Sequence, residues 1–456
     1  MSATPTSDLA AFVAGLRLED VPSRVRERAK DILLDSVGSA IAGHHGDETA
    51  QVTALARTIG ASEESTVIGG SGLSAAGATL VNGYLMTAVT VCDVHRPTLC
   101  HVSPEVVPPA LATAERLDVS GRALLLAIIA GLETTTRVGL GTNYPAFRSR
   151  GWHSPGVIGP FGGAAAVGKL IGLSAVQQRN AFGLAGSQSA GTFAHWGTPT
   201  IKFHQSRAAL SGLMAGILAG ENFTSSQEIL AHPDGGIFNA YSDGGSPAAV
   251  VAELGDRWEL ENISLRLWPA ASSIQSVVTA MFALIDAHDL RPEHVARIRV
   301  GLSETVYKMH GELGWDDKFR ALLSTRYATA VVLHDRRCWL EQFTSERIRD
   351  AATDRFAREK VMVEIDPTVD GTGARVEVTM ADGRVLLDNR PVPRGDASDP
   401  LSRDDIITKF RTASADRLPG SQADEAIDLL ANIEQVDRVS TLCAALRAPV
   451  PVSSAR

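Results

Sequence analysis

The feature that most constrains this chain is helical periodicity, which continues through almost all of residues 1–255. In SRVRERAKDILLDSVGSAIAG (23–43), apolar residues recur every three or four positions and form one helix face. Many such faces carry Ala and Gly, which allow helices to approach closely. Similar patterns recur near residues 51–58, 74–90, 105–117, 121–138, 156–172, 175–190 and 205–220. The sequence therefore predicts a large all-helical domain.

The pattern changes near residue 260, where alternation of apolar and polar residues predicts half-buried strands. ADGR within the last of these segments is typical of a hairpin turn. The alternating segments are HVARIRVGLSE (294–304), KVMVEIDPTV (360–369) and ARVEVTMADGRVLL (374–387). Helical periodicity lies between them, at 270–288 and 318–334, and it returns from Ser402 onward.

We therefore predict a mainly α fold with a large all-helical domain and a smaller α+β domain. The large domain is expected to begin with residues 1–258, the α+β domain to span 259–398, and C-terminal helices in 399–456 to return to the large domain. A length of 456 residues supports two domains, because one ordinary hydrophobic core does not grow to this size.

Composition and charge exclude several classes of protein. Hydrophobic residues make up 44% and charged residues 21%, as in soluble globular proteins, and a net charge of −9 argues against a nucleic-acid-binding surface. The apolar runs at 123–132 and 156–173 are too short or too interrupted to cross a membrane. The N-terminus does not have the pattern of a secretory signal, and the four cysteines show no CxxC spacing. We expect a cytoplasmic protein.

The segment VCDVHRPTLCHVSP (91–104) concentrates chemically active side chains in a loop. His95 and His101 lie six residues apart, and Asp93, Cys92 and Cys100 could complete a metal site. However, a proline separates the histidines, and neither HxxxH nor HExxH is present. A loop of ordinary polar residues is a further alternative. We favour the wall of an acid–base pocket without a metal.

A second cluster lies in GTPTIKFHQSRAALSGLMAGILAGENFT (197–224), where Lys202, His204 and Arg207 precede an Ala-rich helix. The first turn of a helix disfavours cations, so three basic groups there suggest a bound anion such as a substrate carboxylate. A solvated basic helix end is the alternative. His153 lies on a Pro/Gly-rich turn, SRGWHSPGVIGP (149–160), where a lone histidine is more often structural than catalytic.

Two other motifs do not support a function. GAAAVGKL (163–170) resembles a phosphate-binding loop, but Leu170 stands where Ser or Thr must hold magnesium and no strand precedes it. SQSAG (187–191) has Ser187 in place of the first glycine of a nucleophile elbow. No GxGxxG follows a strand, so we expect no dinucleotide cofactor.

Seven segments together resemble the MmgE/PrpD family, which includes 2-methylcitrate dehydratase, cis-aconitate decarboxylase and iminodisuccinate epimerase. They are DILLDSVGSAIAG, VNGYLMTAVTVCDVHRPTLCHVSPEVVPPALATAE, GWHSPGVIGPFGGAAAVGKLIGLS, TPTIKFHQSRAALSGLMAGILA, LRLWPAASSIQ, LLSTRYATAVVL and RGDASDPLSRDDIITKF. The resemblance covers nearly the whole chain. It implies a homodimer with a cofactor-free active site at the interface between the two domains. It also implies that His101, His153, Lys202 and Tyr327 belong to the pocket.

The chain also departs from the family pattern. Dehydratase and decarboxylase members carry Asp-x-Asp-Asp-Thr, but residues 91–95 read Val-Cys-Asp-Val-His, so that only Asp93 remains and His95 replaces the threonine. The lysine of Lys-x-Tyr-Pro is Arg266, and the histidine that follows that motif is Gln275. These changes make the pocket more cationic, which favours a substrate with several carboxylates.

We therefore predict an enzyme that abstracts a proton next to a carboxylate of a polycarboxylate. An epimerase of the iminodisuccinate type is the first interpretation, because epimerisation needs only two proton-exchanging groups and histidine can accept or donate near neutral pH. A desolvated Lys202 could be the second base. The alternative is a lyase of the 2-methylcitrate dehydratase or cis-aconitate decarboxylase type, and a third possibility is a carboxylate-binding protein without catalysis.

We assign the candidate residues to two predicted roles, catalysis and substrate binding. We expect the site to contain neither a metal nor a cofactor. Arg266 could grip a carboxylate through two parallel hydrogen bonds, and Arg96 and Arg207 are weaker candidates for the same role. The predicted catalytic residues are His101, Lys202, His153 and Tyr327. The predicted substrate-binding residues are Asp93, His95, Arg96, His204, Arg207, Arg266 and Gln275.

Overall fold

The computed structural model describes residues 4–448, which form two compact units. The helical unit contains residues up to 263 and from 402 onward, and the α+β unit contains residues 264–401. The predicted fold class, mainly α with a smaller α+β domain, is confirmed. The sequence analysis placed the two boundaries after residues 258 and 398, whereas the units meet after residues 263 and 401.

The helical unit consists of helices joined by loops and a few two-residue strands. Its helices are α1 (Pro5–Gly15), α2 (Ser23–Ala42), α3 (Thr49–Ile59), α4 (Ala75–Ala88), α5 (Ser103–Leu117), α6 (Gly121–Gly141), α7 (Tyr144–Ser149), α8 (Ser154–Leu170), α9 (Ala175–Ser187), α10 (Thr200–Gly220), α11 (Ile237–Tyr241), α12 (Pro247–Val251), α19 (Arg403–Ser414), α20 (Gly420–Ala431) and α21 (Val439–Leu446). The short strands are β1 (Ser65–Thr66), β2 (Gly72–Leu73) and β3 (Val94–His95), and β4 (Ile263–Ser264) lies at the boundary.

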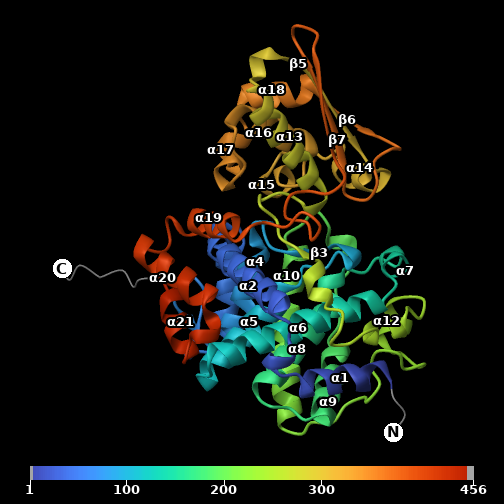
Figure 1. The fold of residues 1–456 in the computed structure, drawn as a ribbon, viewed down its shortest axis with the longest axis vertical. Coiled ribbons are helices and arrows are strands. Elements are labelled where there is room, and N and C mark those ends of the chain that lie inside the picture. Colours follow the sequence, from blue (N-terminus) through green and yellow to red (C-terminus); the bar gives the residue numbers. More distant parts are fainter. Residues whose placement is uncertain (1–3, 449–456) are drawn as a thin grey trace, which may run out of the picture. The chain divides into compact units, whose positions relative to one another are not determined.

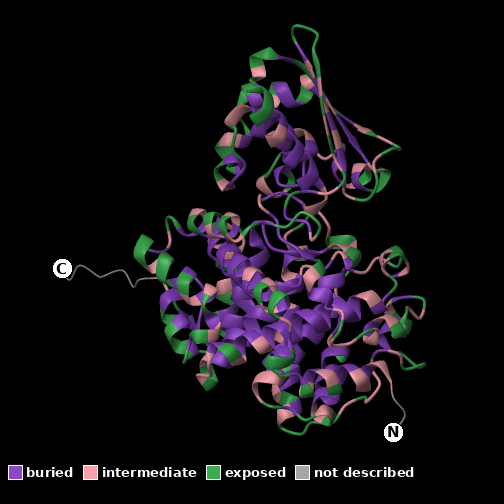
Figure 2. Cartoon of the chain, in the orientation of Figure 1, coloured by how far each residue is buried: buried purple, intermediate pink, exposed green. Residues whose placement is uncertain are grey.

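Helix α8 lies at the centre of the helical unit and packs against α5, α6, α9 and α10. Its residues 154–168 are all buried (Figure 2). Glycines permit this packing, because a Cβ on Gly212 of α10 would lie 2.7 Å from Cα of Gly163 in α8. A Cβ on Gly162 would lie 2.8 Å from the carbonyl oxygen of Gly131 in α6. The segment GAAAVGKL therefore lies inside a buried helix and does not form a phosphate-binding loop.

Helices from both ends of the chain lie side by side in the helical unit, where α19 packs against α2 (Figure 1). Lys409 Nζ donates to the Asp35 carboxylate at 2.6 Å and to the main-chain oxygen of Val91 at 2.8 Å. Both charged side chains are buried. The C-terminal segment therefore fixes the start of the loop that contains His95 and His101.

The α+β unit is built on a four-stranded sheet with the strand order β6-β5-β7-β8. The β5–β6 pair is parallel, and the β5–β7 and β7–β8 pairs are antiparallel. Helices α13 and α16 pack against the sheet, and the predicted turn ADGR connects β7 to β8. The elements are α13 (Gln275–His288), β5 (Val295–Leu302), α14 (Glu304–His310), α15 (Lys318–Ala321), α16 (Thr325–Asp335), α17 (Ser345–Ile348), α18 (Ala351–Lys360), β6 (Val361–Ile365), β7 (Ala374–Met380) and β8 (Val385–Arg390).

Among the described residues, only helix α6 is long and apolar enough to cross a membrane by length and composition. However, 83% of its most apolar window is buried inside the protein, where α6 packs against α5, α8 and α12. It also carries a buried ion pair between Glu133 and Arg137. A core helix has the same composition as a membrane span, so this finding is weak support for a membrane segment.

Replacing Gly212 with Ala is expected to destabilise the protein by ~1–3 kcal/mol, because the new methyl group would meet main-chain atoms of α8 that no rotamer change can move. Urea unfolding measures this change. Gly15→Ala is the matched control, since no atom lies within 4 Å of the position of the added Cβ at the end of α1. Equal stability of the two variants would contradict the close packing of α8 and α10.

Candidate active site

His101 is held in one orientation by the loop of residues 91–102, here called the 91–102 loop. Its Nδ1 lies 2.7 Å from the main-chain oxygen of Asp93. Because a carbonyl oxygen can only accept, Nδ1 carries the hydrogen, and Nε2 of the neutral ring carries the lone pair. The ring is half-buried, and Cys92 Sγ lies 3.8 Å from Nδ1. The loop therefore fixes the orientation of the His101 ring and the position of its Nδ1–H.

His153 and His204 form a direct imidazole pair. His153 precedes α8 as its N-cap residue, His204 lies in the second turn of α10, and their Nδ1 atoms are 3.0 Å apart. Burial, His204, His101 and Arg148 together lower the pKa of His153 well below its ordinary value. His101 is thus electrostatically linked to the His153–His204 pair, and we treat the three histidines as one cluster.

The rings of His153 and His204 have different tautomers, so that their Nε2 atoms differ in chemistry. Burial, Arg207 and His195 lower the pKa of His204 to about 4, so both rings are neutral near pH 7. One Nδ1–H must then donate to the lone pair of the other Nδ1. The donating ring has a basic Nε2, and the accepting ring has an Nε2–H. The pair therefore offers one proton acceptor and one proton donor.

The other two basic groups of this helix are buried or half-buried and bind main-chain oxygens. Lys202 Nζ donates to the carbonyl of Ala88 at the end of α4. The Arg207 guanidinium donates to the carbonyls of Gln188 at 2.6 Å, Gly156 at 2.7 Å and Ala190 at 2.9 Å. The sequence analysis attributed this basic cluster to a bound carboxylate, but carbonyl oxygens provide its negative partners in the structure. A substrate-binding role for Arg207 and a catalytic role for Lys202 stay predictions.

His95 and Asp93 organise the 91–102 loop. His95 is fully buried, with Nδ1 2.8 Å from Thr98 Oγ1 and Nε2 3.0 Å from Glu259 Oε1. The Asp93 carboxylate is also fully buried and accepts hydrogen bonds from residues 102 and 103. Arg96 is half-buried and begins the 3-10 turn Arg96–Thr98. These contacts give His95 and Asp93 structural roles, and their predicted contacts with substrate are untested.

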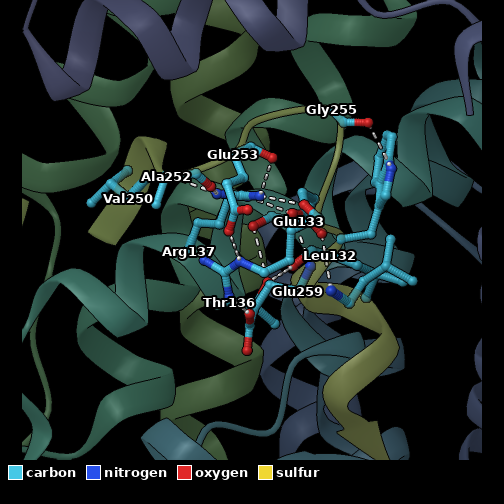
Figure 3. Close-up of polar contacts among 12 residues, drawn as sticks. Leu132, Glu133, Thr136, Arg137, Val250, Ala252, Glu253, Gly255 and Glu259 are labelled. Carbon is cyan, nitrogen blue, oxygen red and sulfur yellow. Dashed lines mark hydrogen bonds and ion pairs between the residues drawn. The ribbon is translucent and has the colours of Figure 1, made fainter. Parts of the chain in front are cut away.

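A buried ion pair in α6 positions the partner of His95 (Figure 3). Glu133 accepts from the main-chain nitrogens of Glu259 at 3.0 Å and Leu260 at 2.9 Å. Arg137, bonded to Glu133, donates to the carbonyl of Ala252 at 2.8 Å, and both charged side chains are fully buried. The ion pair thereby fixes residues 250–260 and brings Glu259 to His95.

The remaining predicted site residues belong to the α+β unit. Gln275 is buried, and its Nε2 donates to the carbonyls of Trp268 at 3.0 Å and Ala270 at 2.9 Å, while Arg266 Nη1 lies 3.4 Å from the Ala270 carbonyl. These contacts stabilise the segment between Arg266 and Gln275. Tyr327 is fully buried, and its hydroxyl donates to the carbonyl of Gln342 at 2.5 Å. Burial raises the pKa of Tyr327.

The part of the chain that the structure describes contains no group of three or more His, Cys, Asp or Glu side chains suited to a metal ion. The contacts of the two histidines in the 91–102 loop show which of their ring nitrogens have partners within the protein. Both ring nitrogens of His95 have side-chain partners, and Nδ1 of His101 faces a carbonyl oxygen.

Comparison with known proteins decides the family. Models of the MmgE/PrpD N-terminal domain and the MmgE/PrpD C-terminal domain match residues 7–249 and 268–435. The chain belongs to the MmgE/PrpD family. The predicted family resemblance is therefore confirmed, and it extends over nearly the whole chain.

The curated relatives of this MmgE/PrpD protein include cis-aconitate decarboxylases. One from Aspergillus terreus is 27% identical over 98% of this chain and 96% of its own length. Those from Mus musculus and Homo sapiens are each 26% identical, over 97% and 98% of this chain and 93% and 95% of their own lengths. The comparisons support an enzyme, and they favour the lyase alternative over the epimerase interpretation.

The sequence analysis did not identify three buried glutamates of this MmgE/PrpD member, Glu105, Glu133 and Glu259. Glu133 and Glu259 act on the 91–102 loop from distant segments, and no local pattern marks them. Glu105 lies in the first turn of α5 and is fully buried. It is the one charged residue in the apolar stretch VSPEVVPPALA, and this isolation is a signal that could have identified it.

Arg137→Met is expected to lower the free energy of unfolding by ~3–5 kcal/mol, because it leaves the buried Glu133 carboxylate without its cation. Chemical denaturation measures the change. Arg320→Met is the control, since Arg320 forms an exposed i,i+4 pair with Asp316 that is worth at most ~1 kcal/mol. A small loss in Arg137→Met would show that Arg137 is not needed to compensate Glu133.

The contribution of His204 to stability is expected to fall as the pH is lowered from about 6.5 to about 4. The pKa of His204 in the folded protein, about 4, lies below its unfolded value, so the unfolded chain binds more protons in this range. His204→Gln should make the decline shallower, whereas His288→Gln, which changes an exposed histidine, should not. Unfolding measured at several pH values tests this. Equal slopes in wild type and His204→Gln would contradict a neutral His204.

Proposed function

We propose that this MmgE/PrpD protein is a cofactor-independent lyase that decarboxylates a polycarboxylate, with cis-aconitate as the first substrate to test. The observation that carries the proposal is similarity to cis-aconitate decarboxylases over nearly the full length of the chain. The cluster of His101, His153 and His204 supports it, because it combines basic nitrogens with a proton donor in one unit.

In the proposed reaction, the bond between a substrate carbon and its carboxylate carbon breaks, and carbon dioxide leaves. The electron pair stays on the substrate and is delocalised toward a neighbouring carboxylate. A proton must then form the new C–H bond. His101 suits this role, because the Asp93 carbonyl accepts the Nδ1–H of either the neutral or the protonated ring. Protonated His101 would deliver the proton from Nε2.

An epimerase is the second candidate, and the tautomers of the His153–His204 pair favour it. One ring offers a basic nitrogen and the other an N–H, which are the two functions that proton exchange at one carbon requires. The loss of the family's acid-rich run also favours it, since only Asp93 remains and its carboxylate is bound to the loop.

One assay separates the candidates. The protein is incubated in heavy water with cis-aconitate and a panel of di-, tri- and tetracarboxylates, and the products are analysed by mass spectrometry and NMR. A decarboxylase releases carbon dioxide and forms a product with one solvent deuterium at the carbon that was protonated. An epimerase introduces deuterium next to a carboxylate without releasing carbon dioxide. A protein that only binds carboxylates shows a thermal shift and no exchange, and this result would refute both candidates.

His101→Asn is expected to lower kcat/KM by ~10²–10⁴-fold, because the Asn amide can donate to the Asp93 carbonyl but has no titrating nitrogen. Carbon dioxide release measures the loss, and circular dichroism tests whether the fold is kept. His294→Asn, which alters an exposed histidine of the α+β unit, is the control and should resemble wild type. Full activity in His101→Asn would exclude His101 as the proton donor.

The assembly and location of the protein are part of the proposal. The family resemblance implies a homodimer, and the sequence favours a cytoplasmic protein whose partner is a small polycarboxylate. Light scattering and cell fractionation test the first two of these statements, and the substrate panel tests the third.

A further inference from the structure

Asp93 holds His101 from both sides. Its main-chain oxygen accepts from His101 Nδ1 at 2.7 Å. Its carboxylate accepts from the main-chain nitrogen of Val102 at 3.0 Å, and from the nitrogen and hydroxyl of Ser103 at 3.1 and 2.6 Å. The ring of His101 and the two residues that follow it are therefore fixed by one aspartate. A shift of Asp93 would move the imidazole.

The surroundings of the Asp93 carboxylate favour its ionised form. It lies at the N-terminus of α5, a 15-residue helix, where main-chain N–H groups and the helix dipole stabilise negative charge. Val102 and Ser103 together donate hydrogen bonds to both oxygens of the Asp93 carboxylate. Burial raises the pKa of Asp93, and the hydrogen bonds from Ser103 and Val102 oppose this rise.

Glu105, in the first turn of α5, differs from Asp93 in the surroundings of its carboxyl group. It is fully buried, and neither carboxyl oxygen has a hydrogen-bond partner in another residue of the described chain. Its side chain packs against α8, where a Cβ on Gly159 would lie 2.4 Å from Cγ and 3.0 Å from Cδ of Glu105. An ionised carboxylate without donors in such a place would be very costly, whereas a protonated carboxyl costs far less.

The charge of Asp93 also acts on Glu105. Burial raises the pKa of Glu105, and the charges of Asp93 and Cys92 add to this rise. In α8, Gly159 lies against the side chain of Glu105, and Gly163 lies near its main-chain oxygen. Besides burial, the charge of Asp35, which is paired with Lys409, raises the pKa of Asp93, and Asp93 in turn acts on the pKa of Arg28. A buried acid with several hydrogen-bond donors loses its proton more readily than one that has none.

We propose that the buried Glu105 keeps its proton while Asp93 is ionised, and that Asp93 positions His101. Asp93 is the positioning residue, and Glu105 keeps a second negative charge away from it. The part of this inference that concerns turnover rests on the proposed function. The part that concerns protonation does not, so the two can fail separately.

The protonation state is tested without substrate, by infrared spectroscopy of the whole protein at pH 7. Wild type is expected to show a carbonyl band of a buried protonated carboxyl, and Glu105→Gln should lose it. Glu115→Gln is the matched control on α5, because Glu115 is paired with Arg447 at 3.1 Å and should leave the band in place. A spectrum of Glu105→Gln that retains the band would overturn the assignment.

A second measurement uses stability against pH. Suppose that Glu105 stays protonated in the folded protein and ionises at about pH 4.5 in the unfolded chain. The folded protein then loses stability as the pH rises above that value. Glutamine has a similar shape and does not titrate. The denaturation midpoint of Glu105→Gln should therefore rise relative to wild type, and the difference should widen from pH 5 to pH 8. A constant difference over this range would contradict a protonated Glu105.

The positioning role is tested with Asp93→Asn and the milder Ser103→Ala, which removes the closest donor to Asp93. Asp93→Asn should lower kcat by about 100-fold with little change in KM, because a displaced catalytic group slows the chemical step. Ser103→Ala should show a smaller loss of the same kind. Normal kcat in both variants would overturn the positioning role. If even wild type turns over no polycarboxylate, the proposed function fails. The infrared and pH results still show whether Glu105 is protonated.

Discussion

The close approach of α8 to its neighbours is the constraint on which the helical unit depends. Glycines at the contacts with α6 and α10 bring main chains within distances that a Cβ would prevent. This separation has a direct chemical result, because His153 immediately precedes α8 and His204 lies on α10. Their Nδ1 atoms, near the starts of these two closely packed helices, lie 3.0 Å apart. Packing of small residues thus sets the geometry of a pair of titratable groups.

Buried charges in the helical unit serve mainly to hold irregular main chain. Glu133 binds N–H groups of residues 259 and 260, Arg137 binds carbonyls between residues 250 and 257, and Asp93 binds N–H groups at the start of α5. Loops within a core leave main-chain donors and acceptors that must be paired. Charged side chains pair them strongly and with fixed direction. The loops that carry His95 and His101 are therefore ordered by acids and bases that need not contact a substrate.

The same effect explains which site predictions the sequence could support. The resemblance to family motifs indicated His101 and His153, and a basic cluster at the start of a predicted helix indicated His204. In the structure, His153 and His204 are in direct contact, and His101 acts on the pKa of His153. The interpretation of Lys202 and Arg207 as a carboxylate-binding cluster considered only side chains. Main-chain oxygens of residues such as Ala88 and Gly156 are acceptors that no residue pattern reveals. The epimerase interpretation gave most weight to a few changed positions, in residues 91–95 and at Arg266 and Gln275, whereas similarity along the whole chain favours a lyase.

Residue periodicity by itself predicted the fold class and the order of helices and strands, because these follow from regular apolar spacing. The resemblance of motifs that are local in the sequence indicated the family. Only the tertiary structure decided which acids are ionised. Asp93 and Glu105 are twelve residues apart in the sequence and equally buried, yet one meets several donors and the other meets none. The protonation of a buried acid depends on its donors and on nearby charge, and folding brings these from α5, α8 and the 91–102 loop.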